Sequence, residues 1–512
     1  MQEAAGRSRA APHSCEADTG GETIQEAKKF VFDVGWTFSG QVAALGLGFL
    51  LTVILGRWLG VAEYGLYALA LILTTLVSMV ACLGIPEAMV RYVAGSGGDR
   101  EAVNASVTVG LINGAGLGVV FAGALFVSSD LLAALFSMPG LAGVIRIVSL
   151  SVPLFVVNNI LLGVLNGMRE MKAHSLRSLL RSLLLVGMNV LFLSAGWGVT
   201  GAALSVVVAE AGILLLMASV AGGRLQFSTR DYAAVSRRLL AFGSRVFLAS
   251  ILYSAMISTD TLMVGYYLDD ADVGVYAMAI ALSRSILLAL PMAVSAVTFP
   301  AIAEYRSLGR TDAIEALMNR TVKYTLMILS VAGVLMICLA GEIIPVLIGP
   351  AFLPAVPPLT VLALAMIAFG PMAAIGAAVT AMDRPDLSSK TNLAVTGTNI
   401  AANAALIPVF GVMGAAIGTA GSFVLLGGML VVVLKRVFGV GIDLAPYRQV
   451  IPAVLVLLGA FFLLRALVHP VPLTVLLVGL YCCFLYAAVL TGEERGVLRR
   501  VGALVAARVP GH

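Results

Sequence analysis

The sequence predicts an all-α, polytopic membrane protein with about 14 transmembrane helices, each spanning about 30 Å of hydrocarbon. The chain has 512 residues, of which 60% are hydrophobic and 12% charged, and its mean hydropathy is +1.02. Soluble domains carry roughly 25% charged residues, so this composition requires lipid around the protein. Because a helix satisfies its backbone polar groups internally, the long apolar stretches are predicted to be helices and not barrel strands.

Polar and Pro/Gly-rich segments divide the apolar sequence into the predicted helices. Three prolines, Pro153, Pro291 and Pro371, fall inside these helices, where each removes a backbone hydrogen bond and permits a kink. The predicted helices are centred near residues 45, 74, 115, 155, 185, 210, 250, 286, 333, 368, 398, 424, 457 and 480.

The positions of the basic residues predict the orientation of these helices. Most of the 32 Lys and Arg residues fall in every second connector and in the two terminal segments. Only Arg57, Arg146 and Arg465 fall in the other connectors or beside them, and Arg284 lies in mid-span. Cytoplasmic loops carry the excess of Lys and Arg, so both termini are expected in the cytoplasm of a protein in the cell membrane.

An internal repeat divides most of the chain into two halves. In LGRWLGVAEYGLYALAL (residues 55–71), Gly56, Gly65 and Tyr67 recur as Gly265, Gly274 and Tyr276 in VGYYLDDADVGVYAMAI (residues 264–280). The segment WGVTGAAL (residues 197–204) recurs at nearly the same offset as FGVMGAAI (residues 410–417). We therefore predict two six-helix lobes of like orientation, related by a pseudo-two-fold axis along the membrane normal, with a cavity between them.

The predicted organisation has five parts. A disordered cytoplasmic tail is followed by an N-lobe with helices 1–6, a C-lobe with helices 7–12, a helix pair outside the repeat, and a second cytoplasmic tail. Their expected boundaries are residues 1–29, 30–222, 223–440, 441–490 and 491–512.

Two stretches of the sequence resemble a known family. LGRWLGVAEYGLYALAL followed by LGIPEAMVRYVA, and STDTLMVGYYLDDADVGVYAMAIAL with its acid at Asp260, are similar to the polysaccharide-biosynthesis flippases. These belong to the multidrug/oligosaccharidyl-lipid/polysaccharide exporter superfamily. The resemblance covers roughly residues 30–436, and it implies translocation of a polyprenyl-diphosphate-linked oligosaccharide from the cytoplasmic to the outer leaflet. Alternating access through the central cavity is then the expected mechanism.

Arginines within the spans are the candidate ligands of such a diphosphate, because a guanidinium stays charged and donates paired hydrogen bonds to phosphate oxygens. We expect Arg284 and Arg146 in the lumen and Arg57 and Arg181 at its mouths. Arg181 has a structural alternative, since long basic side chains near a cytoplasmic helix end extend to lipid phosphates. Arg284 has another, a buried pair with Glu210.

The remaining candidates are acids and amides. Glu210 is expected to act as a counter-charge in the lumen or as the partner of Arg284. Asp260 is expected either to bind a coupling ion, Na⁺ or H⁺, or to cap backbone amides. Asn158 and Asn159 are candidates for bonds to sugar hydroxyls, with interhelical hydrogen bonds as the alternative.

The sequence contains no pattern of an enzyme. Zinc-protease, serine-hydrolase and Walker motifs are absent, and the five cysteines and four histidines have no metal-ligand spacing. We therefore expect no catalytic residue, metal or cofactor, and no nucleic-acid partner. Expected partners are membrane lipids, the lipid-linked glycan, and a glycan polymerase or ligase. The alternatives are a cation-coupled multidrug exporter, a lipid II flippase, or a membrane-embedded glycan polymerase or ligase.

Overall fold

The computed structural model describes residues 19–496, apart from residues 97–98, 169, 223–225, 288 and 382–384. Every regular element in these ranges is a helix, which confirms the all-α prediction. The predicted tails fall largely outside the described residues, which start at Thr19, already within the first helix. The elements are α1 (Thr19–Cys82), α2 (Ile85–Ala94), α3 (Arg100–Val127), α4 (Ser129–Leu135), α5 (Leu141–Ser149), α6 (Ser151–Gly167), α7 (Met171–Ser194), α8 (Gly198–Gly222), α9 (Tyr232–Tyr267), α10 (Asp270–Leu287), α11 (Ala289–Ser307), α12 (Thr311–Leu347), η1 (Pro350–Ala355), α13 (Val356–Ala381), α14 (Pro385–Phe410), α15 (Val412–Phe438), α16 (Ala445–Leu464), α17 (Pro470–Phe484) and η2 (Leu485–Val489).

Twelve helices in the described part of the chain are long and apolar enough to cross a membrane. One of them, Ala43–Cys82, contains two of the predicted helices, and α9 is not among the twelve. The protein is therefore a multi-pass membrane protein, and the number 14 stays a prediction.

Helix α1 is two helices joined at a kink. Gly60 has φ 72° and ψ −178°, a conformation outside the helical region that a side chain would strain. The kink falls inside the repeated segment 55–71, where the sequence predicts the turn between helices 1 and 2. Both arms of α1 lie against α10, since a Cβ on Gly56 would overlap Met278 and one on Gly65 would overlap the Asp270 carbonyl.

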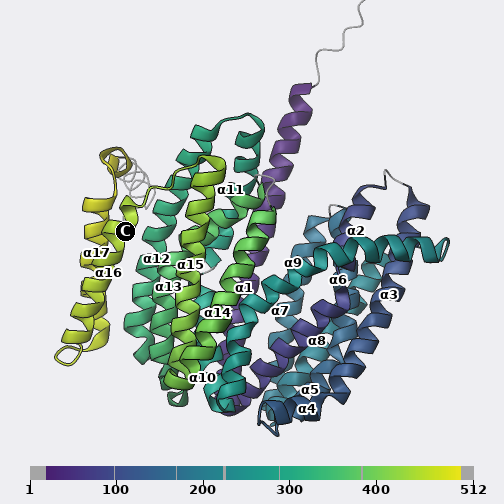
Figure 1. Cartoon of the computed structure of the whole chain (residues 1–512), viewed down its shortest axis with the longest axis horizontal. Helices are drawn as coiled ribbons and strands as arrows, with labels where there is room; N and C mark the ends of the chain where they lie inside the picture. The colour runs from purple at the N-terminus through teal and green to yellow at the C-terminus, as the bar shows by residue number, and fades with distance from the viewer. Residues whose placement is uncertain are drawn as a thin grey trace, which may run out of the picture.

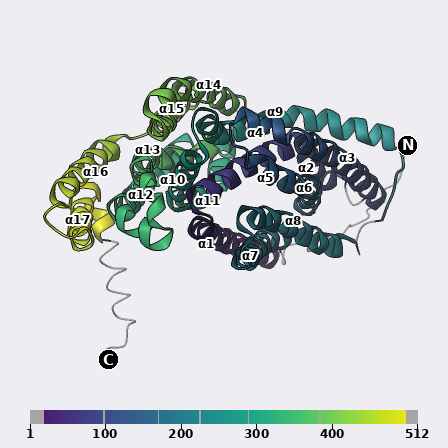
Figure 2. The same cartoon turned by 90° about the horizontal axis from the view of Figure 1, so that it is seen from below.

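The helices form two groups that meet along α1 (Figure 1). Helices α3 to α8 form one group, and α10 to α15 form the other. Helices α16 and α17 pack on the outer side of α12, at the edge of the second group, as the view from below also shows (Figure 2). The described helices thus form two groups and an additional helix pair, and the predicted lobe boundaries and pseudo-two-fold axis stay predictions.

Helix α9 connects the two groups. Its first turns lie across α2 and α3 of the first group (Figure 1). Tyr232 donates a hydrogen bond to Oδ1 of Asn113 in α3, and Nδ2 of Asn113 donates to Ser236 over 2.8 Å. The backbones of Gly84 and Gly243 are in contact, so a Cβ on either glycine would overlap the backbone of the facing segment. Helix α9, which starts the predicted C-lobe, therefore packs on the surface of the first group of helices.

Candidate functional site

The first polar cluster lies between α6, α7 and α8. Glu210 in α8 is buried, with 1% of its surface exposed. Its Oε1 accepts a hydrogen bond of 2.6 Å from Nε of Arg181 in α7. Its Oε2 accepts one of 2.8 Å from Nδ2 of Asn158 in α6, which also donates to the Glu210 carbonyl. The structure thus brings together three of the residues that the sequence singled out.

Arg177 is a member of this cluster that the sequence analysis missed. It lies one helical turn before Arg181 on the same face of α7 and interacts electrostatically with Glu210. Among the described residues, its Nε is buried and makes no hydrogen bond, and the same holds for Oδ1 of Asn158. Two guanidinium groups and one carboxylate give the cluster a net positive charge, which favours an anion. The spacing of Arg177 and Arg181 was the signal that could have identified it.

The second polar cluster lies between α9, α10 and α15. Asp260 in α9 is buried, and its Oδ2 accepts hydrogen bonds from Tyr276 (2.7 Å) and Thr419 (3.2 Å). Its Oδ1 accepts one of 2.9 Å from the backbone N–H of Thr261. The carboxylate thus caps one amide and also joins hydroxyls from two other helices, and its role in ion coupling stays a prediction.

Two amides of α14 lie beside the second cluster. Nδ2 of Asn403 donates to Oδ1 of Asn399 over 3.1 Å. Oδ1 of Asn403 lies against Gly418, the neighbour of Thr419, and it is buried without a hydrogen bond among the described residues. The carboxylate of Asp260 and the hydroxyls of Tyr276 and Thr419 thus meet between α9, α10 and α15, and such oxygens are the ligands of hard cations.

The other candidates lie apart from these clusters. Arg284 in α10 is half-buried and near enough to Tyr276 for an electrostatic interaction. The ion pair that the structure gives for Glu210 is the one with Arg181, and a pair between Arg284 and Glu210 stays an untested alternative. Nδ2 of Asn159 donates to the Phe155 carbonyl over 2.9 Å, which is a hydrogen bond within its own helix.

Arg146 and Arg57 lie at the end of the bundle that the charge pattern predicts to be outside. Arg146 forms an ion pair with Asp130 and donates to Oγ of Ser129. Nη1 of Arg57 donates to the carbonyl oxygens of Val346 (2.7 Å) and Leu347 (3.4 Å) at the end of α12. Because Arg146 is already paired with a carboxylate, it is a weaker candidate for a phosphate ligand than the sequence suggested.

Comparisons with known proteins agree with this architecture. A family model for polysaccharide biosynthesis proteins matches residues 54–357. The "Probable flippase AglR" of Haloferax volcanii is 34% identical over 169 residues, which are 31% of this chain. The "Probable low-salt glycan biosynthesis flippase Agl15" of the same organism is 26% identical over 164 residues. The matched region is 34% of the length of each of these relatives.

Solved structures with the same fold include "Lipid II flippase MurJ, inward closed conformation", with a TM-score of 0.73 and 15% identity. That match covers 90% of this chain and 99% of the other. An inward-facing multidrug resistance MATE family transporter of the MOP superfamily has a TM-score of 0.60 and 16% identity, over 81% of this chain and 98% of the other. At such low identities the similarity establishes the fold alone.

Proposed function

The chain belongs to the family of polysaccharide biosynthesis proteins, and from this premise we propose that it is a flippase for a polyprenyl-diphosphate-linked oligosaccharide. The observation that carries this proposal is the cluster of a buried carboxylate and amide, Glu210 and Asn158, with the partly buried guanidinium groups of Arg177 and Arg181, and its net charge is positive. A diphosphate carries two or more negative charges, and it enters a low-dielectric site only where cations compensate it. The cluster supplies that compensation within the N-lobe.

The geometry suggests how the cluster holds its cargo. Nε of Arg181 donates to Glu210, and we propose that the two Nη groups of the same guanidinium donate to phosphate oxygens. The Nε of Arg177 supplies a further donor. Glu210 therefore acts as a counter-charge that keeps the arginines in place between transport events, and Arg284 supplies positive charge from the C-lobe side. Asn158, with Oδ1 unbonded, is placed to accept a hydrogen bond from a hydroxyl.

The second cluster is our candidate for energy coupling. Binding of Na⁺ or H⁺ at Asp260 neutralises a buried carboxylate that contacts α10 and α15. Such neutralisation changes the relative stability of two packings of these helices, which is what coupling of an ion gradient to transport requires. The sequence contains no Walker loop, so an ion gradient or the membrane potential is the proposed energy source.

The proposed setting is the cell membrane, with both termini in the cytoplasm. The pattern of Lys and Arg supports this orientation. A glycan polymerase or ligase on the outer side would consume the translocated lipid, and we propose no catalytic step for this chain itself.

Deletion of the gene, followed by mass spectrometry of lipid extracts, tests the proposal. We expect a polyprenyl-diphosphate-linked oligosaccharide to accumulate, and the wild-type chain to clear it. The double variant Arg177→Gln/Arg181→Gln, at equal protein levels, should fail to clear it. The matched control is Lys435→Gln/Arg436→Gln, which removes two charges from the last turn of α15.

Two other cargoes would give different results. Unchanged glycans together with drug sensitivity would favour a cation-coupled multidrug exporter. The cluster of oxygen atoms at Asp260 and the fold shared with the MATE transporter suggest this alternative. Accumulation of lipid II alone would favour a lipid II flippase, in line with the other structural relative. Either result would overturn the proposed cargo.

A further inference from the structure

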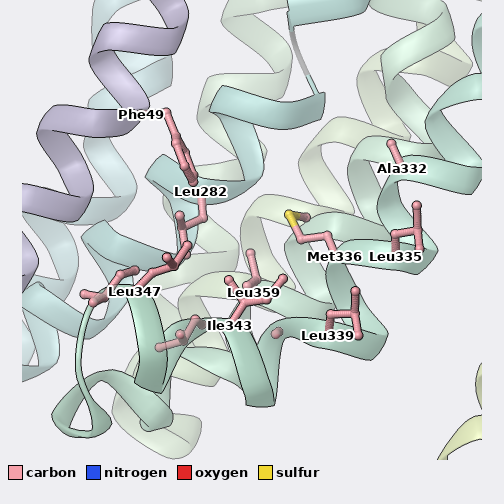
Figure 3. Close-up of a pocket in the computed structure, with 12 residues that line it drawn as sticks. Phe49, Leu282, Ala332, Leu335, Met336, Leu339, Ile343, Leu347 and Leu359 are labelled. Atoms are coloured by element: carbon pink, nitrogen blue, oxygen red, sulfur yellow. The ribbon is translucent and has the colours of Figure 1, made fainter. Parts of the chain in front are cut away.

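An apolar groove lies on the surface between α1 and α12. It has a volume of about 310 Å³, and twelve hydrophobic side chains line it (Figure 3). Phe49 extends from α1 towards Leu282 of α10 at one side, and Leu339 and Ile343 of α12 lie at the other (Figure 3). The floor is buried, whereas Ile343 is 42% exposed. The groove is therefore open to the lipid and closed on the protein side.

The groove ends beside a guanidinium group. Leu347 and Ile348, which line it, follow directly on Val346 in the last turn of α12. Nη1 of Arg57 donates to the carbonyl oxygens of Val346 and Leu347, so this hydrogen bond fixes the arginine at the end of the groove. The Arg57 side chain is exposed, and only Nη1 of its guanidinium group donates to the two carbonyl oxygens. Its remaining donors can bind a phosphate.

The groove also lies on the seam between the two lobes. Phe49 and Arg57 belong to the first arm of α1, in the N-lobe, whereas the other lining residues come from α10, α12 and α13 of the C-lobe. A lipid-linked cargo must keep its hydrocarbon chain in the bilayer while its polar head crosses between the lobes. The chain must therefore leave the protein along a seam, and the head must emerge at the end of it.

We infer that this groove binds the isoprenoid chain of the carrier lipid, with its phosphate at Arg57, after the head has reached the outer side. The inference rests on the proposed function, and it adds an exit site to it. An apolar wall with one cationic end is complementary to an amphiphile with a long hydrocarbon chain and an anionic head. A volume near the lower end of the range of ligand pockets, about 300–1,000 Å³, holds the first isoprene units and leaves the rest of the chain in lipid.

Photolabelling of the full-length protein in lipid nanodiscs tests the inference. The probe is undecaprenyl phosphate with a diazirine on the isoprene unit next to the phosphate, and peptide mass spectrometry locates the label. We expect labels on α12 between Leu339 and Leu347, next to the carbonyls that hold Arg57. Excess undecaprenyl phosphate should compete for this site, whereas excess phosphatidylglycerol should not.

Variants then separate the chain site from the head site. Leu339→Trp fills the groove, and it should reduce labelling by about tenfold or more because burial of the chain is the source of affinity. Leu335→Trp is the second filling variant if the first fails to fold. The matched control is Leu463→Trp in α16, a side chain that is 77% exposed and does not line the groove, and this variant should label normally. Arg57→Gln should weaken labelling by the phosphate probe but not by the corresponding uncharged polyprenol.

Labels elsewhere, unchanged labelling of both filling variants, or equal competition by phosphatidylglycerol would overturn the inference. The proposed function is scored separately, by the accumulation of lipid-linked glycan in the deletion strain. Accumulation without labelling of the groove removes the exit site and keeps the flippase. Groove labelling without accumulation keeps a polyprenyl-phosphate site and removes the proposed cargo.

Discussion

Glu210 shows how a single residue acquires a role from its neighbours. Its carboxylate is 1% exposed, and both of its oxygens accept hydrogen bonds, one from Arg181 and one from Asn158. Removing one member of a buried ion pair leaves the other charge without compensation, which costs far more than the pair contributes in net terms.

We predict that Glu210→Ala destabilises the protein by about 3 kcal/mol, because Arg181 and Asn158 lose their shared acceptor inside the helix bundle. Thermal unfolding of the purified protein in detergent measures this. The control is Glu101→Ala, which removes an exposed ion pair with Arg230 and should leave the melting temperature unchanged. Equal melting temperatures for both variants would show that the Glu210 cluster has no structural role.

At the scale of helices and connecting segments, the acidic side chain of Glu494 attaches the segment after α17 to α12. Glu494 lies outside the membrane-spanning helices, and it accepts hydrogen bonds from Lys323 (2.6 Å), Tyr324 (2.7 Å) and the Thr491 amide (2.7 Å). Burial by itself raises the pKa of Glu494, but these donors outweigh it and lower the pKa from 4.5 to about 2. The attachment therefore depends on an ionised carboxylate.

The sign of this shift predicts release of the segment by acid. A lowered pKa stabilises the docked form at every pH above the unfolded value of about 4.3, and the stabilisation is lost as the pH falls from there towards 2. Spin labels at residues 444 and 496, in a variant without the native cysteines, should show a narrow distance distribution at neutral pH that broadens in acid. The distance distribution of the Glu494→Gln variant should be broad at every pH, whereas that of Glu493→Gln should still broaden only in acid.

For the whole molecule, the contact between the repeated segments is the decisive one. Helices α1 and α10 make the most extensive contact of any pair in the described part of the chain. The repeated glycines meet in it, since a Cβ on Gly65 would overlap the Asp270 carbonyl and one on Gly274 would overlap that of Val61. In the alternating-access cycle that we propose, the lobes separate at one end while they close at the other, so we expect this close contact to open.

We predict that a cross-link over this contact stops transport. Val61→Cys and Asp270→Cys, in a variant without the native cysteines, would be joined by a methanethiosulfonate linker that a reductant cleaves. Translocation of lipid-linked glycan in proteoliposomes should fall to background and recover on reduction. The control pair is Asn319→Cys with Asp443→Cys, where Oδ1 of Asn319 accepts from the Asp443 amide on one side of the seam. Full activity of the cross-linked Val61/Asp270 protein would exclude opening at this point.

The sequence by itself determined the class of the protein, its helical spans and the resemblance to its family. These features depend on local quantities, such as the length of an apolar stretch, the positions of basic residues and short motifs around Gly65 and Gly274. The same information selected Glu210, Arg181 and Asn158 as intramembrane polar residues, because such residues stand out wherever they occur in an apolar span.

Only the tertiary structure decided which of these residues act together. Glu210 bonds Arg181 and Asn158 across 29 and 52 residues of chain, and Asp260 bonds Thr419 across 159. Those pairings depend on which faces of the helices meet, and in an apolar helix the periodicity that would mark a face is weak because lipid and neighbouring helices accept the same side chains. The pairing of Glu210 with Arg181 was therefore not predicted, Arg177 was missed, and the groove beside Arg57 depends on how α1 and α12 pack together.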